Sequence, residues 1–241
     1  MIKRLTDLSD ISGALPLMSV IQTDLRFACA DYEGVFCQEI NEEKTLVLSL
    51  RGETATICRL SGNADIEELS LFLSFRQVKN ILSDFFFEGF SLEKRAVLKA
   101  ETQYAPCEDI NVLSASSSIK DYKAVFQLLS HKGEFEAWYP PFSRKVNNLY
   151  ACGVYLSDNS ITVSCAVAPF VFGGVGIVAG VFTNEKYRNK GFASRCVKSL
   201  LSEMKSKGVE ETYLWCEDKN IKLYESIGFS VCGQIYVKKE E

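Results

Sequence analysis

The sequence predicts an α/β protein with a mixed sheet (α+β), made of two α/β halves. Residues 160–184 carry no charged side chain and are rich in valine, isoleucine, threonine and serine, which favours buried strands. Residues 193–204 have apolar side chains at spacings of three and four, the pattern of a helix that packs on a sheet. Strand-like runs followed by a helical run also occur at residues 44–75, in the N-terminal half.

The composition is that of a globular protein. With 241 residues, the chain can form one large or two small domains with an ample core. Its apolar fraction is 47% and its charged fraction 24%. A net charge of −4 argues against a dedicated nucleic-acid-binding protein, and the first residues lack the apolar core of a signal peptide. We therefore expect a cytoplasmic protein with no nucleic-acid or membrane partner.

Cysteine and histidine usage argues against a metal site. The 9 cysteines are scattered without a Cys-x-x-Cys pair. They are best interpreted as small buried hydrophobic residues in a reducing compartment, rather than as disulfides or metal ligands. The single histidine, His131, makes zinc sites and Ser-His-Asp triads hard to build and is most simply a helix-end residue. No metal is expected.

In the N-terminal half, a β-hairpin is predicted from residues 44–50 and 54–60. Asn63 and Asp65 stand where a helix N-cap belongs, ahead of a predicted helix over residues 66–75.

A further strand is expected at residues 78–82. The aromatic cluster at residues 85–90, which begins with three phenylalanines, could bind a ligand, but packing in a core or a domain interface is the better interpretation. The segment 101–118, with Pro106 and a run of serines, is predicted to connect the two halves.

The C-terminal half is predicted to begin with an amphipathic helix over residues 120–130. The aromatic run 138–142 follows and is expected in a loop. Strands at residues 149–156 and within 160–184 are expected to form a three-stranded antiparallel meander, its last two strands joined by residues 169–174. The pattern then predicts two further strands, Leu214-Trp215-Cys216 and residues 230–237.

A basic loop with one glycine joins the strand predicted at residues 175–182 to the predicted helix. The first N–H groups of a helix have no acceptor inside it, and the helix dipole adds partial positive charge there. Arg188 and Lys190 supply full charges, and Gly191 allows a ligand to approach the backbone closely. This loop is therefore a candidate phosphate site.

Two familiar nucleotide-binding loops do not fit this segment. A Walker loop needs Gly-Lys followed by Ser or Thr, and a dinucleotide fingerprint needs Gly-x-Gly-x-x-Gly. Residues 181–194 contain only one glycine, Gly191. What remains is an Arg-x-x-Gly-x-Ala pattern at Arg188, Gly191 and Ala193.

This pattern resembles the acetyl-coenzyme-A-binding segment of the GCN5-related N-acetyltransferase (GNAT) superfamily. The resemblance extends upstream to residues 181–183 and downstream to residues 220–229, where a short helical stretch with Tyr224 precedes Gly-Phe at the start of a strand. The two signatures occur in the expected order. The resemblance implies the GNAT acyl-CoA N-acyltransferase fold in the C-terminal half, with acetyl-CoA as the acyl donor.

The resemblance also assigns roles to residues. In the family, loops after the first helix help to wall the acceptor pocket, so the resemblance implies that the run 138–142 would either select the substrate by shape or simply pack. Tyr224 matches the tyrosine that often protonates the departing coenzyme A thiolate, although packing on the cofactor or the core would explain it equally well. Backbone groups that would hold pantetheine and the thioester carbonyl belong to Val181, Phe182 and Thr183. The pyrophosphate would be held by Arg188, Asn189, Lys190, Gly191, Phe192, Ala193 and Ser194.

Two departures from the family pattern leave the general base open. The family commonly has an asparagine seven residues before the tyrosine, where this chain has Glu217, and Asn220 stands only four before it. The predicted strand 175–182 also lacks the acidic residue that some relatives use as a base. Glu217, Asp218 or a chain of water molecules leading to solvent could take the proton.

The sequence thus predicts an acetyl-CoA-dependent N-acetyltransferase that acts on an amine of a small molecule or a protein by direct attack in a ternary complex. Two alternatives stay open: a non-catalytic coenzyme-A-binding module, and an acyltransferase with a longer acyl or an aminoacyl donor. Residues 1–110 are expected to form a smaller α/β domain that resembles a degenerate GNAT half, and residues 111–241 the GNAT domain. A monomer or a homodimer is expected.

Overall fold

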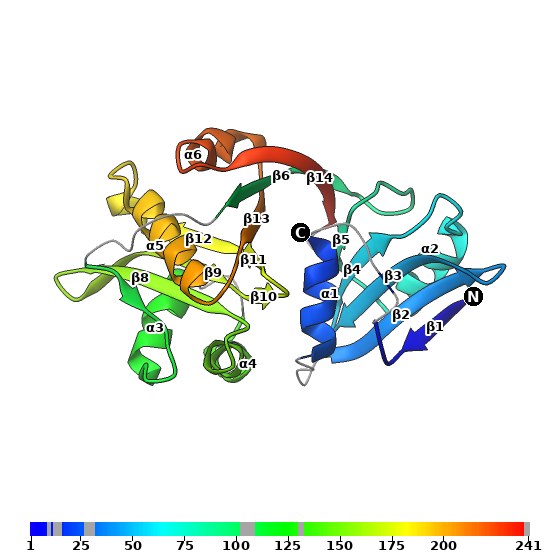
Figure 1. Ribbon diagram of the computed structural model, residues 1–241, viewed down its shortest axis with the longest axis horizontal. Helices are drawn as coiled ribbons and strands as arrows, with labels where there is room; N and C mark the ends of the chain where they lie inside the picture. Colours follow the sequence, from blue (N-terminus) through cyan, green and yellow to red (C-terminus); the bar gives the residue numbers. More distant parts are fainter. Residues whose placement is uncertain (9–10, 12–15, 27–31, 102–108, 130–132, 239–241) are drawn as a thin grey trace. The chain divides into compact units, whose positions relative to one another are not determined.

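The computed structural model describes residues 1–8, 11, 16–26, 32–101, 109–129 and 133–238, and its elements are labelled in Figure 1. The chain divides into two compact units. Unit 1 comprises Met1–Val97 and Gly233–Glu241, and unit 2 comprises Leu98–Cys232. Strands β6 (Glu93–Glu101) and β14 (Ser230–Lys238) each contribute residues to both units.

Unit 1 is built around a mixed sheet. Its strands follow the order β1-β2-β3-β4-β5-β14. The β4–β5 pair is parallel and the other pairs are antiparallel. In chain order its elements are β1 (Ile2–Leu5), α1 (Leu17–Arg26), β2 (Tyr32–Ile40), β3 (Glu43–Arg51), β4 (Thr54–Arg59), α2 (Ile66–Phe75) and β5 (Asn80–Ser83).

Strand β3 carries the core of unit 1 on both of its faces. Val47 packs against Ile21 of α1, whereas Leu48, on the opposite face, packs in the cluster that contains Leu69 of α2. All four side chains are fully buried. This two-sided burial explains why residues 46–50 are apolar except for Ser49.

Most predicted elements of unit 1 are confirmed. The hairpin is β3–β4, and helix α2 starts at its predicted cap, where Asp65 Oδ1 accepts the Glu68 amide at 2.9 Å. Strands β1, β2 and β6 and helix α1 are additional to the predicted elements. Helix α1 is hard to recognise because its buried face includes the polar residues Thr23 and Asp24.

The phenylalanine run behaves only partly as expected. Phe85 and Phe87 pack in the α2 cluster, which confirms the core prediction for these two rings. Phe86 is 55% exposed, and its ring centroid lies 5.7 Å from that of Tyr236 on β14. The alternation follows because neighbouring side chains of an extended segment point in opposite directions.

Unit 2 contains two sets of strands, ordered β6-β13-β11-β10 and β12-β9-β8-β7. Helices α3 and α4 cover one face of the second set and α5 the other (Figure 1). Its further elements are β7 (Asn111–Val112), α3 (Ile119–Leu128), α4 (Phe135–Asn147), β8 (Cys152–Asp158), β9 (Ile161–Ala168), β10 (Phe170–Phe172), β11 (Val175–Val178), β12 (Gly180–Thr183), η2 (Glu185–Tyr187), α5 (Phe192–Ser206), β13 (Glu211–Cys216), η3 (Asp218–Asn220) and α6 (Ile221–Glu225).

The expected position of the aromatic run of unit 2 was wrong. The run 138–142 lies within helix α4, not in a loop, although Pro140 and Pro141 interrupt its backbone hydrogen bonds. Ring packing offsets that loss, as where Trp138 stacks on Phe142 with centroids 4.6 Å apart. The connecting segment 101–118 includes strand β7, which pairs with β8.

The uncharged stretch 160–184 forms strands, as predicted, but not a simple meander. Strands β8, β9 and β12 are neighbours in one sheet, and both pairs are antiparallel. Residues 169–174 include strand β10, which pairs with β11. The strand predicted at 175–182 is two strands, because β11 pairs with β13 and β12 with β9. Within the described residues no helix is long and apolar enough to span a membrane.

Six of the seven described cysteines are buried, and Cys232 is exposed. The prediction for His131 lies outside the described residues.

Candidate active site

The split between strands β11 and β12 organises the candidate active site. Strand β11 runs parallel to β13 up to the pair Val178–Leu214, and β12 pairs with β9 from Gly180 onward. The two strands therefore diverge at Ala179. Strand β13 continues to Cys216 beyond its last residue paired with β11. Among the described strands, only β9 pairs with β12, which leaves the other edge of β12 open.

A β-bulge marks the point of divergence. The Ala179 amide donates to the Val167 carbonyl at 3.1 Å, and Gly180 is the register partner of the same residue. Two residues of one strand thus oppose one of the other, which bends the strand locally. A Cβ on Gly180 would lie 2.7 Å from Val167 Cγ2, so only glycine fits the bulge without displacing β9.

Beyond the bulge, two amides of β12 point to its open edge. The Asn184 amide donates to the Val163 carbonyl at 2.9 Å, so it points toward β9. Backbone groups along a strand alternate in direction. The Phe182 amide therefore also points toward β9, whereas the amides of Val181 and Thr183 point away from it. A ligand lying along this edge would find these two amides, whereas the Thr183 carbonyl accepts a hydrogen bond from Arg188 Nε at 3.5 Å.

The chain leaves β12 through a tight turn. Asn184 Oδ1 accepts the Lys186 amide at 3.2 Å and starts helix η2. Asn189 and Gly191 have φ angles of 61° and 77°, in the left-handed region that these two residue types tolerate best. The turn delivers the chain to α5, whose first helical residue is Phe192.

The N terminus of α5 has no side-chain cap. Gly191 is the N-cap residue, and the first amide with a helical acceptor is that of Arg195, which donates to the Gly191 carbonyl at 3.1 Å. The structure assigns no acceptor among the described residues to the amides of residues 192–194. The first turn contains no acidic residue. These amides, together with the helix dipole, therefore favour an anion.

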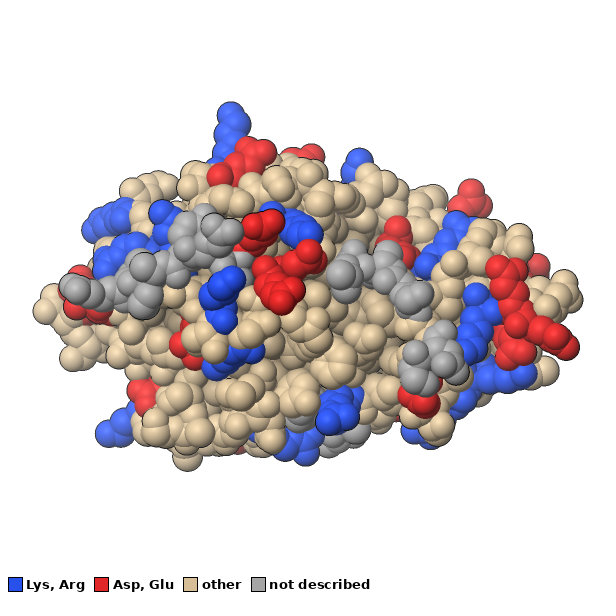
Figure 2. Space-filling view, in the orientation of Figure 1, with Lys and Arg blue, Asp and Glu red and all other residues tan. Residues whose placement is uncertain are grey.

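Arg188 and Lys190, two of the basic residues in the turn, lie at the surface. Arg188 pairs with Glu185 at 3.4 Å, and both side chains are mostly exposed. The Lys190 Nζ atom lies 5.3 Å from the centroid of the Tyr187 ring. Contacts this exposed contribute little to stability, so both cations can turn toward a bound phosphate at small cost. Figure 2 shows lysine and arginine side chains interspersed with acidic ones on the visible face.

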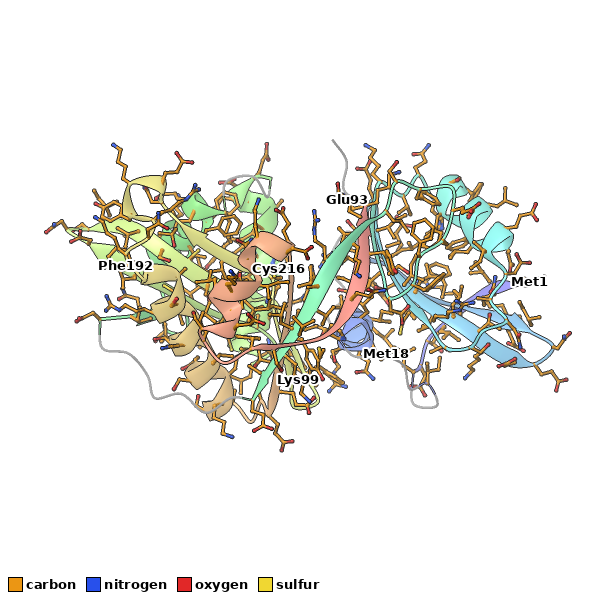
Figure 3. All side chains as sticks on the ribbon, turned by 90° about the horizontal axis from the view of Figure 1, so that it is seen from above. Met1, Met18, Glu93, Lys99, Phe192 and Cys216 are labelled. Carbon is orange, nitrogen blue, oxygen red and sulfur yellow. The ribbon has the colours of Figure 1, made fainter. Side chains whose placement is uncertain are left out.

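Tyr224 lies on the short helix α6, which follows β13. Its carbonyl accepts the amides of Ile227 and Phe229 at 3.0 and 3.1 Å, and its ring centroid lies 6.0 Å from that of Phe229. Burial, followed by the nearby Cys216 thiol, raises the pKa of Tyr224 to about 12. The phenol is therefore protonated throughout the neutral range. Figure 3 labels Cys216, at the end of β13, and Phe192, at the start of α5.

Two carboxylates follow β13 directly. Glu217 pairs with Lys219 at 2.5 Å, and Asp218 opens helix η3. Both are exposed. The amide of Asn220 donates to the Glu217 carbonyl at 2.9 Å, which closes the turn into α6.

One contact of the site was missed in the sequence. Ser164, buried on β9, donates from Oγ to the Phe182 carbonyl at 3.0 Å and lies 2.9 Å from Thr183 Oγ1. It thereby ties β12 to its neighbour beyond the bulge. The uncharged run offered no signal for this serine, because the contact depends on the register of two strands.

The fold of unit 2 is the one shared by acyl-CoA N-acyltransferases of one family. Residues 119–229 match the family model of the Acetyltransferase (GNAT) family. That range contains the strand split, the basic turn, the start of α5 and Tyr224. Residues 119–229 therefore form a GNAT domain, and this part of the chain belongs to that family.

Solved structures of GNAT proteins share the fold over nearly the whole chain. A GCN5-related N-acetyltransferase from Kribbella flavida superposes with a TM-score of 0.61 at 14% identity, covering 95% of this chain and 97% of that chain. For a GCN5-related N-acetyltransferase-like protein from Streptococcus suis the TM-score is 0.59 at 14% identity, with 94% and 95% covered. A tandem GNAT protein from the clavulanic acid biosynthesis pathway gives 0.58 at 8% identity, with 95% and 89% covered. The last likeness fits a tandem arrangement of two GNAT-like halves. No curated protein matches the sequence.

Proposed function

We propose that this protein is an acetyl-CoA-dependent N-acetyltransferase that passes the acetyl group directly to an amine in a ternary complex. The observation that carries the proposal is the strand split at Ala179, which leads from an open strand edge to an uncapped, basic helix start. An extended ligand that has amides at one end and a pyrophosphate at the other matches this order of groups. Acetyl-CoA is such a ligand.

The residues present fit the donor. The pantetheine arm carries amides that can pair with the open edge of β12, at Val181 and Thr183. The pyrophosphate can take the free amides of residues 192–194, with Arg188 and Lys190 close enough in sequence to add charge. We assign the donor's cofactor contacts to Val181, Phe182 and Thr183 on the strand and to residues 188–194 on the turn and helix.

In the transfer, the amine attacks the thioester carbonyl, a C–N bond forms and the C–S bond breaks. An amide of β12 that points to the open edge can stabilise the developing oxyanion, because a fixed donor costs no reorganisation during the reaction. Much of the acceleration would come from holding donor and acceptor in attack geometry. The products are an N-acetyl amide and the thiol of coenzyme A.

Tyr224 is the residue proposed to assist the leaving group. An ordinary thiol has a pKa of about 8.5, whereas that of Tyr224 is about 12. The phenol therefore holds its proton more tightly than a free thiolate would. Its best role is a strong hydrogen bond to the departing sulfur, with the thiol's final proton coming from the amine through solvent or a base.

A base is needed because an ordinary amine has a pKa of about 10 and is mostly protonated at neutral pH. Glu217 and Asp218 follow the end of β13 and reach solvent. We propose that one of them receives the proton through water.

The proposal is tested by following the release of coenzyme A thiol from acetyl-CoA over a panel of amines. Tyr224→Phe should lower kcat about tenfold to a hundredfold and leave KM for acetyl-CoA nearly unchanged, because the contact forms only as the C–S bond breaks. Tyr236→Phe, in unit 1, is the control and should not change kcat. Acetyl-CoA binding without any turnover would instead support a non-catalytic coenzyme-A-binding module. Faster turnover with a longer acyl-CoA would mean that this longer acyl-CoA, and not acetyl-CoA, is the donor.

A further inference from the structure

Two hydroxyl groups join strand β9 to the end of β12. Ser164 Oγ, on β9, donates to the Phe182 carbonyl at 3.0 Å and lies 2.9 Å from Thr183 Oγ1. The Ser164 side chain is fully buried. Water therefore does not compete for these contacts, and a hydrogen bond in the protein interior is electrostatically stronger than one in water.

The direction of these hydrogen bonds follows from the number of protons. A hydroxyl group has one proton to donate and two lone pairs that accept. A carbonyl oxygen only accepts, so the Ser164 proton goes to Phe182. The Thr183 hydroxyl is then the donor in its contact with Ser164. The bonds form a chain that runs from Thr183 through Ser164 to the Phe182 carbonyl, and the bonds of such a chain strengthen one another.

The Phe182 carbonyl and the Thr183 amide belong to the same peptide group. A trans peptide group is planar, and its C=O and N–H bonds point in opposite directions. The hydrogen bond that fixes the carbonyl therefore also fixes the Thr183 amide, which points to the open edge of β12. Polarisation of the carbonyl makes that amide a stronger donor as well.

The peptide group that follows Thr183 is fixed too. The Asn184 amide donates to the Val163 carbonyl at 2.9 Å. The Thr183 carbonyl, in the same peptide group, accepts Arg188 Nε at 3.5 Å. Thr183 is thus held by hydrogen bonds on both of its sides.

The other outward amide of β12 lacks this support. The Val181 amide belongs to the peptide group that starts at Gly180, in the β-bulge. The contacts of the Ser164 hydroxyl are made to Phe182 and Thr183 instead. A change at Ser164 should therefore act on one outward amide and spare the other, which serves as an internal reference.

Resting on the proposed function, we infer that Ser164 is a positioning residue for the acyl-CoA donor. It holds the Thr183 amide in the direction in which that amide donates to a carbonyl of the donor. An amide that is already fixed loses little freedom on binding, so its hydrogen bond contributes more to affinity. Without the Ser164 hydroxyl the peptide group rotates more freely, and the contact with the donor weakens.

The test measures acetyl-CoA binding by calorimetry and residue-resolved amide hydrogen exchange on the whole chain. Ser164→Ala should weaken acetyl-CoA binding about threefold to tenfold. In this variant acetyl-CoA should protect the Thr183 amide less than in the wild type, and the Val181 amide as before. Thr183→Val removes the other hydroxyl of the chain. Combining it with Ser164→Ala should weaken binding less than the product of the two single effects, because both act through one chain of hydrogen bonds.

Ser49→Ala is the matched control. Ser49 is a buried serine of β3 in unit 1, and its Oγ donates to Asp24 at 2.9 Å. Both serine-to-alanine variants remove one hydroxyl and its buried hydrogen bond, so both should melt below the wild type. Only Ser164→Ala should bind acetyl-CoA more weakly. A merely structural role of Ser164 would lower the melting temperature without this loss.

Two results would overturn the inference: equal acetyl-CoA affinity of Ser164→Ala and Ser49→Ala, or an equal loss of protection at Val181 and Thr183. If Ser164→Ala unfolds in a thermal melt, Ser164→Cys replaces it, because a thiol is only a weak donor. Binding to the wild type separates the possible failures. Acetyl-CoA binding that Ser164→Ala leaves intact refutes only the positioning role, whereas no binding to the wild type refutes the donor site as well.

Discussion

Two glycines at opposite ends of helix α5 allow a matched test of the proposed donor site. Gly191 is its N-cap, with φ 77°, and Gly208 follows its C-cap, with φ 80°. A Cβ at either position would meet nothing within 4 Å. Alanine at each site would therefore strain the backbone without a steric clash inside the protein. The two variants should differ only in what a ligand would encounter.

The strain can be estimated. A residue with a Cβ in the left-handed region costs about 1–2 kcal/mol. In a chain of this size each kcal/mol lowers the melting temperature by roughly 2–4 °C. Gly191→Ala and Gly208→Ala should therefore each lose about 1–2 kcal/mol of unfolding free energy and melt roughly 2–8 °C below wild type.

Acetyl-CoA should then separate the variants. At about a hundred times its dissociation constant, a ligand adds about 2.7 kcal/mol to the native state. Gly208→Ala should keep this gain. At Gly191 the new methyl group would stand among the amides proposed for the pyrophosphate. A tenfold loss of affinity would reduce the gain to about 1.4 kcal/mol at the same concentration.

Calorimetric melts of the three proteins with and without acetyl-CoA measure both effects. An equal acetyl-CoA shift in Gly191→Ala and Gly208→Ala would refute the placement of the pyrophosphate at the start of α5. An equal loss of the shift in both variants would mean that the strain, and not the contact, weakens binding.

Three further predictions concern stability. Because burial raises the pKa of Tyr224 from 10.0 to about 12, the wild type should lose stability as pH rises from about 10 through 12. Tyr224→Phe should lose less unfolding free energy over this range. If urea unfolding gives the same pH dependence of stability for both proteins from pH 9 to about 11.5, the prediction is contradicted. Gly180→Ala should lower the free energy of unfolding, measured in urea, by about 1–3 kcal/mol, because its Cβ would lie 2.7 Å from the stiff side chain of Val167. A decrease below about 0.5 kcal/mol would contradict this and show that β9 shifts easily. Asp65→Ala should lower the free energy of unfolding by about 1 kcal/mol, because it removes the side-chain cap of α2. Glu67→Ala is the control, and equal stabilities of the two variants would argue against the cap.

Local chemistry explains what could be predicted from the sequence. The turn before α5 needs residues that tolerate a left-handed backbone at two positions, and Asn189 and Gly191 are such residues. The cap of α2 is likewise a contact between near neighbours, from Asp65 to Glu68. Features of this kind depend on a few consecutive residues, so a single sequence reveals them.

Non-local pairing explains what could not be predicted. Residues 175–182 form one uninterrupted apolar run, and nothing in it shows that the strand changes partners at Ala179. That change is set by β9 and β13, which lie elsewhere in the chain. Similarly, Pro140 and Pro141 indicate a loop locally, whereas contacts of α4 with α3 and β8 keep the segment helical.

The central claim is that the donor lies along the open edge of β12 and at the start of α5. Residue-resolved amide hydrogen exchange with and without acetyl-CoA tests it most directly. Acetyl-CoA should slow exchange at Val181, at Thr183 and at residues 192–194. It should change Phe182 little, because that amide already points toward β9. Unchanged exchange at all of these amides, or protection confined to unit 1, would contradict the claim.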